Sequence, residues 1–400
     1  GPVILGKGTF RYAGTAPGDL TQGYTVNSGG GNASTVLDVQ TNLTVSGKVD
    51  VTGSQGRVLK TGPGTLTYTY PGFQVMNRTG SGTTPDATLV FDPVNGGAGT
   101  QGYQDFTVAD GKIVFNTPGQ TNRFYGMTCI GVRYPAAAQM EIGAGVVQNP
   151  DTWFAISRGN GDTNTPYSSG LTMTGGRLEA RSFVMGYNAG MPGFKSYPTL
   201  TQTGGDIVIS DDAYVPETGG AVATVNITGG TLTQNGLNQG FDVGRSGTAG
   251  TVMNVAGGAV VSLAKLRVNS GTFTVSSGGT LALRSTASEN KGTVYFDNAT
   301  LTTYAPQGQP SEWFHGTSKL YVKSGGLTAG VPSGQYAFLA STPQADPASP
   351  GGQITKTGDG TLALYNAEMP VQVNAGTLRL MGAHIRSEEH TSELQSRLHL

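Results

Sequence analysis

The sequence predicts an all-β protein, a parallel β-helix with irregular loop insertions, and three observations lead to this prediction. One short pattern of alternating apolar residues and paired glycines returns six times between residues 171 and 327. Glycine makes up 64 of the 400 residues, which is more than twice its usual share of about 7%. Before residue 385, no window of a dozen residues carries the apolar stripe of a helix without an interrupting glycine or proline.

The repeated unit is typical of a strand, a corner and a second strand. Two apolar residues lie two positions apart, and a Gly-Gly step and a further apolar residue follow. An apolar spacing of two is the period of a β-strand, and glycine adopts the positive φ that a sharp corner needs. The copies are Leu171–Leu178, Leu200–Ile207, Val225–Leu232, Met253–Val260, Phe273–Leu281 and Leu320–Leu327.

The spacing of these units indicates the kind of repeat. Their second glycines fall at 176, 205, 230, 258, 279 and 326, which gives intervals of 29, 25, 28, 21 and 47 residues. Short strands and glycine corners at this period favour identical coils stacked on one another, the arrangement of a parallel β-helix. The last interval predicts two coils, one of which carries a degenerate unit.

Charge and cysteine content narrow the possible partners. The formal net charge is −1 and only 12% of the residues are charged. No basic stripe occurs, which argues against a nucleic-acid partner and against anionic membrane surfaces. Cys129 is the single cysteine, so it cannot form an internal disulfide, and we expect it to be a small buried apolar residue. So few cysteines suit a chain that crosses an oxidising periplasm.

We expect three segments along the chain. Residues 1–165 form irregular N-terminal coils with insertions, residues 166–382 form the regular Gly-Gly coils, and residues 383–400 form a non-native or disordered tail. The stretches expected to leave the rod as insertions are 70–104, 115–140, 302–317 and 329–353. Insertions of this kind are where a solenoid usually carries its function.

Two glycine motifs carry a family resemblance. Val243-Gly244 leads through Gly250 to Gly257-Gly258, and a similar spacing recurs loosely from Val184-Met-Gly186 to Gly204-Gly205 and from Arg158-Gly159 to Gly175-Gly176. Lys60–Leu66 and Lys356–Leu362 both read Lys-Thr-Gly-x-Gly-Thr-Leu. These motifs, within residues 40–380, resemble the passenger domains of bacterial autotransporters and the autotransporter-associated β-strand repeat proteins.

The resemblance implies a right-handed β-helix that is exported through an outer-membrane β-barrel. On this basis we expect the chain at the cell surface of a Gram-negative-type bacterium or in the extracellular space. The C-terminal end of the chain does not carry these glycine motifs. Arg386–Ser396 resembles a one-frame translation of a common sequencing adapter, so residues 383–400 are predicted to be an artefact, the alternative being an amphipathic cap.

Catalytic carboxylates were considered because some glycan-cleaving enzymes are parallel β-helices. Such enzymes need two carboxylates about 5–10 Å apart or a calcium-assisted base. The best pair is Asp211-Asp212, with Asp206 five residues earlier on what would be a neighbouring strand. We interpret these residues as a solvated turn, because aspartate bonds its own backbone in turns. Trp313-Phe314-His315 could form an aromatic glycan platform, but we favour a packed insertion.

Other chemical sites find little support. Gly159–Asn164 resembles half of a calcium-binding nonapeptide repeat, but a single copy cannot complete the ion's shell. His315 is the only histidine before residue 383, so no Ser-His-Asp set can be drawn. The glycine-rich stretches follow no βα unit, which excludes a phosphate cradle. We therefore expect no catalytic residue, no cofactor and no metal site.

The sequence thus predicts a non-enzymatic, secreted or cell-surface rod, the passenger of an autotransporter-type protein that acts as a stalk, an adhesin or a matrix component. Its expected partners are surface glycans or other copies of itself, with no nucleic acid and no membrane span. The alternative is a β-helix polysaccharide lyase or glycoside hydrolase. That alternative would be favoured by at least three carboxylates or basic residues gathered on one outer face of adjacent coils.

Overall fold

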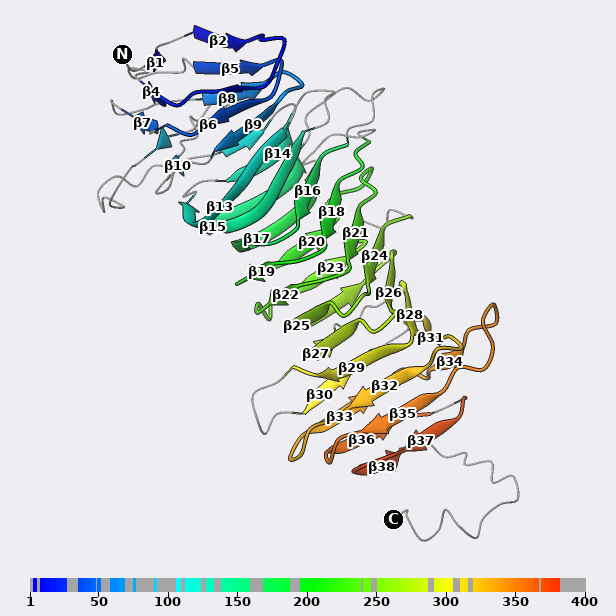
Figure 1. Ribbon diagram of the computed structural model, residues 1–400. Helices are drawn as coiled ribbons and strands as arrows, with labels where there is room; N and C mark the ends of the chain where they lie inside the picture. The colour runs from blue at the N-terminus through cyan, green and yellow to red at the C-terminus, as the bar shows by residue number, and fades with distance from the viewer. Residues whose placement is uncertain are drawn as a thin grey trace, which may run out of the picture.

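The chain is a rod of stacked β-coils, seen in a computed structural model with its first strands at one end and its last strands at the other (Figure 1). Every regular element within the described residues is a β-strand. The structure describes residues 3–5, 8–26, 35–47, 49–51, 58–68, 75–76, 90–91, 106–108, 112–123, 127–132, 138–158, 168–187, 195–238, 240–245, 250–286, 291–304, 310–315, 319–366 and 368–381.

The coils are built from three parallel ladders, which we call A, B and C in the order in which a full coil passes through them. Ladder A contains β3 (Gly18–Asp19), β6 (Leu43–Val45), β9 (Thr65–Tyr68), the starts of β13 (Lys112–Arg123) and β15 (Gln139–Arg158), β16 (Gly170–Met173), β18 (Thr199–Gln202), β21 (Thr224–Ile227), β24 (Val252–Val255), β26 (Thr272–Ser276), β28 (Thr293–Asp297), β31 (Lys319–Val322) and β34 (Gln344–Ala345).

Ladder B is the second ladder of a full coil. It contains the end of β13, the middle of β15, the start of β17 (Arg177–Tyr187), β19 (Asp206–Ile209), β22 (Thr231–Gln234), the starts of β25 (Val260–Val268) and β27 (Thr280–Thr286), β29 (Ala299–Thr303), β32 (Leu327–Gly330), β35 (Ile354–Thr357) and β37 (Val371–Val373). A separate parallel sheet holds the same place in the first coils: β1 (Val3–Leu5), β4 (Tyr24–Val26) and β7 (Val49–Val51).

Ladder C closes each coil and runs from the first coil to the last. It contains β2 (Gly8–Tyr12), β5 (Thr35–Val39), β8 (Val58–Thr61), β12 (Phe106–Val108), β14 (Thr128–Val132), the ends of β15 and β17, β20 (Ala213–Val215), β23 (Phe241–Val243), the ends of β25 and β27, β30 (Ser311–Trp313), β33 (Tyr336–Leu339), β36 (Thr361–Leu364) and β38 (Thr377–Leu380). The parallel β-helix predicted from the repeat is therefore confirmed.

The core is a column of apolar side chains that runs along the inside of the three ladders. In ladder A the register places Leu171, Leu200, Val225, Met253 and Phe273 directly above one another, and none is more than 1% exposed. Alternate residues of each strand point outward, so buried and half-buried side chains alternate along the strand. Each inward side chain contributes about 1.5–3 kcal/mol, which makes the column the main source of stability.

The Gly-Gly steps form corners that stack backbone on backbone. Gly176, Gly205 and Gly230 have φ values of 64°, 72° and 73°, in the left-handed region. A Cβ atom on Gly205 would lie 2.4 Å from the carbonyl oxygen of Gly175 in the preceding coil. Both the conformation and the close approach therefore require glycine at this position.

The 47-residue interval between paired glycines holds two coils, as predicted. The register runs from Thr280 to Thr300 and from Thr300 to Thr328. The corner before Thr300 is made by Asn298, with a φ of 51°. Asparagine tolerates this left-handed conformation better than most residues, so the degenerate unit keeps its corner without glycine.

Three of the four expected insertions contain strands of the coils. The stretch 115–140 includes β14, 302–317 includes β30, and 329–353 includes β33 and β34, all paired within ladders A and C. The prediction that these stretches leave the rod is wrong, because their short strands lack the Gly-Gly corner used to recognise a coil. In 70–104 the described residues are β10 (Val75–Met76) and β11 (Val90–Phe91), an antiparallel pair outside the ladders.

The ladders continue across the expected boundary at residue 165. The start of β15 pairs with β16, and its later part pairs with β17. The distinction between irregular and regular coils and the handedness of the helix stay predictions. The tail 383–400 lies outside the described residues.

A buried lysine holds the corner after β35. Lys356 is 0% exposed, and its Nζ donates to the carbonyl oxygens of Thr357, Gly358 and Ala375 at 2.8, 2.6 and 3.1 Å. Ala375 belongs to the next coil, so the amine ties two coils together. Burial lowers the pKa of Lys356, and the charge of Asp359 partly opposes this effect. The contact gives a structural reason for the lysine of the Lys-Thr-Gly motif.

Replacing Lys356 with methionine should lower the free energy of unfolding by about 1–2 kcal/mol, because three carbonyl oxygens lose their donor while the packing volume is kept. Urea denaturation followed by circular dichroism measures the change. Lys319→Met, at an exposed position of β31, removes the same charge and should have little effect. Equal losses in the two variants would contradict the role of the buried amine.

Candidate functional site

The three aspartates considered from the sequence lie on and directly after one strand. Asp206 begins β19, whereas Asp211 and Asp212 follow the end of that same strand. The chain is extended only to Ile209 and bends at residues 210 and 211. Asp206 therefore lies on the strand that leads into this turn, and not on a strand of an adjacent coil as expected. Asp211 and Asp212 do lie between β19 and β20, in the turn that we expected.

The aromatic platform considered at Trp313-Phe314-His315 is also wrong. Trp313 and Phe314 are 0% and 1% exposed, and Phe314 packs edge to face on Phe296 with ring centroids 5.8 Å apart. Only His315 is exposed, and its Nδ1 lies 2.5 Å from Oε1 of Glu312. The packed interpretation is confirmed, but the residues fill the core of a coil rather than an insertion.

The remaining sites considered from the sequence give no candidate. Cys129 is buried, as expected. Gly159–Asn164 lies outside the described residues. Among the described side chains, no group of three or more histidine, cysteine, aspartate or glutamate residues is placed to hold a metal ion. The described part of the chain also contains no helix with the length and apolarity needed to cross a bilayer.

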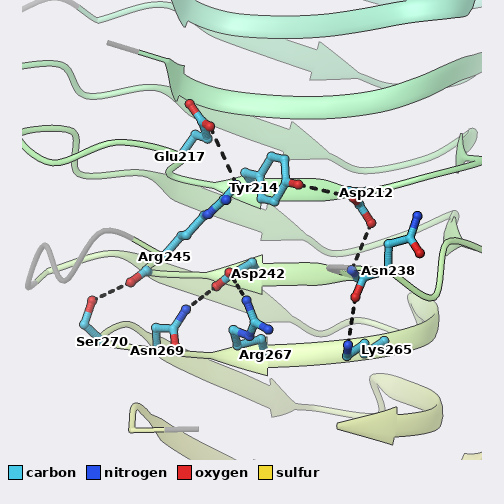
Figure 2. Close-up of polar contacts among 12 residues, drawn as sticks. Asp212, Tyr214, Glu217, Asn238, Asp242, Arg245, Lys265, Arg267, Asn269 and Ser270 are labelled. Atoms are coloured by element: carbon cyan, nitrogen blue, oxygen red, sulfur yellow. Dashed lines mark hydrogen bonds and ion pairs between the residues drawn. The ribbon is translucent and has the colours of Figure 1, made fainter. Parts of the chain in front are cut away.

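A network of polar side chains lies on the outer face of ladder C, across three successive coils (Figure 2). The strands β20, β23 and β25 carry it, and their register places Tyr214, Asp242 and Arg267 in one outward column. We call this network the ladder C cluster, and define it as Asp212, Tyr214, Glu217, Asp242, Arg245, Arg267 and Asn269.

Asp242 is the buried centre of the ladder C cluster. Its two neighbours in β23 face the core, so its carboxylate is on the outer side, yet the residue is 0% exposed. Nδ2 of Asn269 donates to Oδ1 at 2.7 Å, and Nη1 of Arg267 donates to Oδ2 at 3.3 Å. Burial raises the pKa of Asp242 to about 6, although Arg267, Arg245 and Asn269 each act to lower it.

Arg245 links the same coil to the preceding one. Its guanidinium carbon lies 4.1 Å from the centre of the Tyr214 ring, and its Nη1 lies 3.6 Å from Oε1 of Glu217. The Tyr214 hydroxyl donates to Asp212 at 3.2 Å. Burial raises the pKa of both Tyr214 and Glu217; Asp212 raises that of Tyr214 further, and Arg245 opposes both shifts.

Backbone contacts extend the ladder C cluster from coil to coil. The Gly240 amide donates to Asp212 at 3.0 Å, and the Ser270 hydroxyl donates to the Gly244 carbonyl at 2.7 Å. Nζ of Lys265 donates to the carbonyl oxygen of Asn238 at 2.8 Å. Each of these contacts joins one coil to the next, so the ladder C cluster stabilises stacking in this part of the rod.

The outward column of ladder C becomes apolar on the N-terminal side of Tyr214. The register continues through Val184 and Ala155 to Cys129, and all three side chains are buried although they face outward. Larger, half-buried side chains pack around them, namely Met127, Trp153, Tyr187 and Tyr214. The rings of Trp153 and Tyr187 meet at 80° with centroids 4.9 Å apart.

Sequence reasoning missed the ladder C cluster because its members come from three different coils. The available signal was a polar residue in the middle of a short apolar strand, as in Phe241-Asp242-Val243 and Leu266-Arg267-Val268. That signal becomes a cluster only when the strands are aligned. The alignment meets the criterion set for the enzymatic alternative, because Glu217, Asp242 and Arg245 share one outer face of adjacent coils.

Comparisons with protein-family models, with curated proteins and with solved structures found no match to this chain. The functional argument therefore depends on the parallel β-helix and on the side chains of its outer faces.

Proposed function

We propose that this protein is a non-enzymatic rod of the cell surface or the extracellular space, acting as a stalk, an adhesin or a matrix component. The observation that carries the proposal is the continuity of ladder C, in which every coil from β2 to β38 pairs with the next. Backbone hydrogen bonds along the axis and an unbroken apolar column make such a stack stiff. A stiff rod holds its outer faces at a distance from its point of attachment.

The two Lys-Thr-Gly-x-Gly-Thr-Leu motifs support the finer proposal that the rod is an autotransporter-type passenger. In the second motif, Lys356 and Gly358 both contact backbone groups of adjacent coils. The residues on which the resemblance rests therefore have a role in building coils. The localisation that follows is the surface of a Gram-negative-type bacterium or its surroundings.

Two measurements on the full chain test this proposal. Small-angle scattering should give the profile of an elongated rod, and a compact profile would contradict it. A glycan array, run beside assays for new reducing ends and for new unsaturated bonds, should show no cleavage. Binding without cleavage would support an adhesin, absence of both would support a passive stalk, and cleavage would overturn the non-enzymatic proposal.

A polysaccharide lyase or glycoside hydrolase is the second candidate, and the ladder C cluster is the observation in its favour. Glu217 and Asp242 are carboxylates with raised pKa, which is a common feature of catalytic acids and bases. The burial of Asp242 argues against it, because a carboxylate with 0% exposure cannot touch a sugar. Cleavage activity that is lost in Glu217→Gln would establish this candidate.

A further inference from the structure

We propose that the outer face of ladder C carries a binding site for a flat, uncharged, β-1,4-linked polysaccharide, made by Tyr336, Phe338 and Tyr365, which we call the aromatic patch. The patch lies on β33 and directly after β36, in the part of the rod far from its first strands (Figure 1). This inference rests on the proposed function of the rod as an adhesin. It names both the face of the rod and the chemical class of the ligand.

Two rings of the aromatic patch come from one strand. Tyr336 and Phe338 are alternate residues of β33, and Ala337 and Leu339 beside them belong to the core. Tyr336 and Phe338 therefore face outward, and both are half-buried. Alternate residues of a parallel strand lie about 7 Å apart, so the two rings follow one another along the strand on one face of the sheet.

The third ring comes from the next coil. The backbone amide of Tyr365 donates to the carbonyl oxygen of Leu339 at 3.3 Å, which continues the parallel register of β33 and β36 by one residue. Leu364 lies in the core, so Tyr365 faces outward, where it is 52% exposed. In this register Tyr365 is the diagonal neighbour of Phe338, at a distance of about 8 Å.

A small residue between the rings keeps the aromatic patch shallow. Ala363 pairs with Phe338, and its two neighbours in β36, Leu362 and Leu364, belong to the core. Ala363 therefore faces outward, yet it is 0% exposed. Its register partners in the adjacent coils are the larger Phe338 and Arg379. Larger side chains thus lie over Ala363 along the sheet, and the patch presents a broad surface rather than separate projecting rings.

The rings of the aromatic patch have no partner within the described part of the chain. The outward rings of Tyr295 and Tyr321, on ladder A, stack on each other with centroids 5.5 Å apart and so cover each other's faces. Among the described residues, no stacked ring, cation or side-chain hydrogen bond engages the three rings of the patch in this way. Their solvent-facing sides are therefore available to a ligand.

The charges around the aromatic patch balance one another. Glu312, in the preceding coil, is paired with His315, whose Nδ1 lies 2.5 Å from its Oε1. Arg379, in the following coil, is exposed. Asp359, at the corner before β36, acts on the buried amine of Lys356. Neither sign is in excess, so the patch favours an uncharged ligand.

The size of the aromatic patch favours a sugar chain over a second copy of the protein. Three aromatic side chains of ~150–250 Å² each, two of them already half-buried, offer much less than the ~800 Å² per partner of a stable protein interface. A β-1,4-linked chain of hexoses is a flat ribbon whose C–H faces can lie on aromatic rings. The distance of about 8 Å between Phe338 and Tyr365 exceeds the ~4.5–7 Å of rings that stack on each other, so each ring would meet a different sugar unit.

The test is calorimetric titration of the full chain with cellohexaose and chitohexaose, which are uncharged and β-1,4-linked, and with maltohexaose, which is uncharged and α-linked. We expect saturable binding of cellohexaose or chitohexaose that does not weaken with added salt, and at least about tenfold weaker binding of maltohexaose. Equal binding of maltohexaose would overturn the flat ligand class, and weakening by salt would overturn the uncharged class. Absence of binding of both β-linked oligomers would overturn the proposal.

Variants locate the site. Tyr365→Ala and Phe338→Ala should each weaken binding at least about tenfold, whereas Tyr365→Trp, which keeps a ring, should retain it. The matched control is Tyr197→Ala, at a tyrosine outside the patch that is 43% exposed, and it should leave binding unchanged. Tyr365→Ala tests the site by itself if Phe338→Ala fails to fold, because Tyr365 is exposed. Unchanged binding in Tyr365→Ala would place the ligand elsewhere and overturn the proposal.

The aromatic patch and the proposed function can fail separately. A rod that scatters as elongated but binds neither β-linked oligomer keeps the stalk function while the patch fails. Cleavage of cellohexaose or chitohexaose, seen as new reducing ends, would refute the non-enzymatic function and not the binding.

Discussion

Gly205→Ala is expected to lower the free energy of unfolding by about 3 kcal/mol. The φ of Gly205 is 72°, a conformation that costs alanine about 1 kcal/mol. An added Cβ would also lie 2.4 and 2.5 Å from the carbonyl oxygens of Gly175 and Gly176. Those oxygens belong to the backbone of the neighbouring coil and cannot move without shifting it. Urea denaturation followed by circular dichroism measures the loss.

Two other glycines separate the contributions of conformation and contact. Gly258 has a φ of 82° but no atom within 4 Å of an added Cβ, so Gly258→Ala should cost only the backbone strain, about 1 kcal/mol. Gly219 also has open space around an added Cβ and does not have a positive φ. Gly219→Ala should be neutral or slightly stabilising. If Gly205→Ala lowered the free energy of unfolding no more than Gly258→Ala does, the close contact between stacked corners would not contribute to the cost of the substitution.

The stability of the rod should fall as the pH rises from about 4 to about 7, by about 3 kcal/mol from Asp242 alone. The pKa of Asp242 is raised from 3.8 to about 6 by burial. The folded chain therefore holds this proton more tightly than the unfolded chain. The corresponding stabilisation is complete below pH 4 and is lost as the pH passes through 6. Glu217, whose pKa burial also raises, acts in the same direction.

Asp242→Asn isolates this effect because it removes the titrating group and keeps its size. Denaturation curves between pH 4 and pH 8 should show that the difference in stability between the natural chain and Asp242→Asn changes by about 3 kcal/mol over this range. Asp151→Asn, at an exposed position of β15, is the matched control for removal of one carboxylate. A constant difference across the pH range for Asp242→Asn would contradict a raised pKa.

Local features of the chain could be predicted from the sequence and are confirmed. The Gly-Gly units gave the corners at Gly176, Gly205 and Gly230, and the alternation of apolar residues gave the strands beside them. These features depend on short-range chemistry, namely the two-residue period of a strand and the φ that glycine tolerates. The irregular coils were harder to recognise from the sequence. The coil that contains β30, for example, turns at Asn298 rather than at glycine.

The direction of some side chains could not be predicted in the same way. Trp313-Phe314-His315 was compatible with an outer platform, but Trp313 fills the core, where its indole nitrogen donates to the Leu283 carbonyl at 2.9 Å. A three-residue strand such as β30 carries too few residues to indicate which alternate set faces inward. The pairing of β30 with β33 determines which residues of β30 face inward, because it places Trp313 beside Leu339, itself a core residue.

The sequence by itself determined that this protein is a stack of β-coils, because strand period and corner conformation are local properties that each repeat carries separately. Only the tertiary structure decided which residues of different coils share an outer face. Coil lengths vary, so the column of Tyr214, Asp242 and Arg267 cannot be read from spacing and exists only through the register of β20, β23 and β25. The same register buries Asp242 between neighbouring coils, whereas the Arg245 side chain, two residues beyond the end of β23, is 35% exposed.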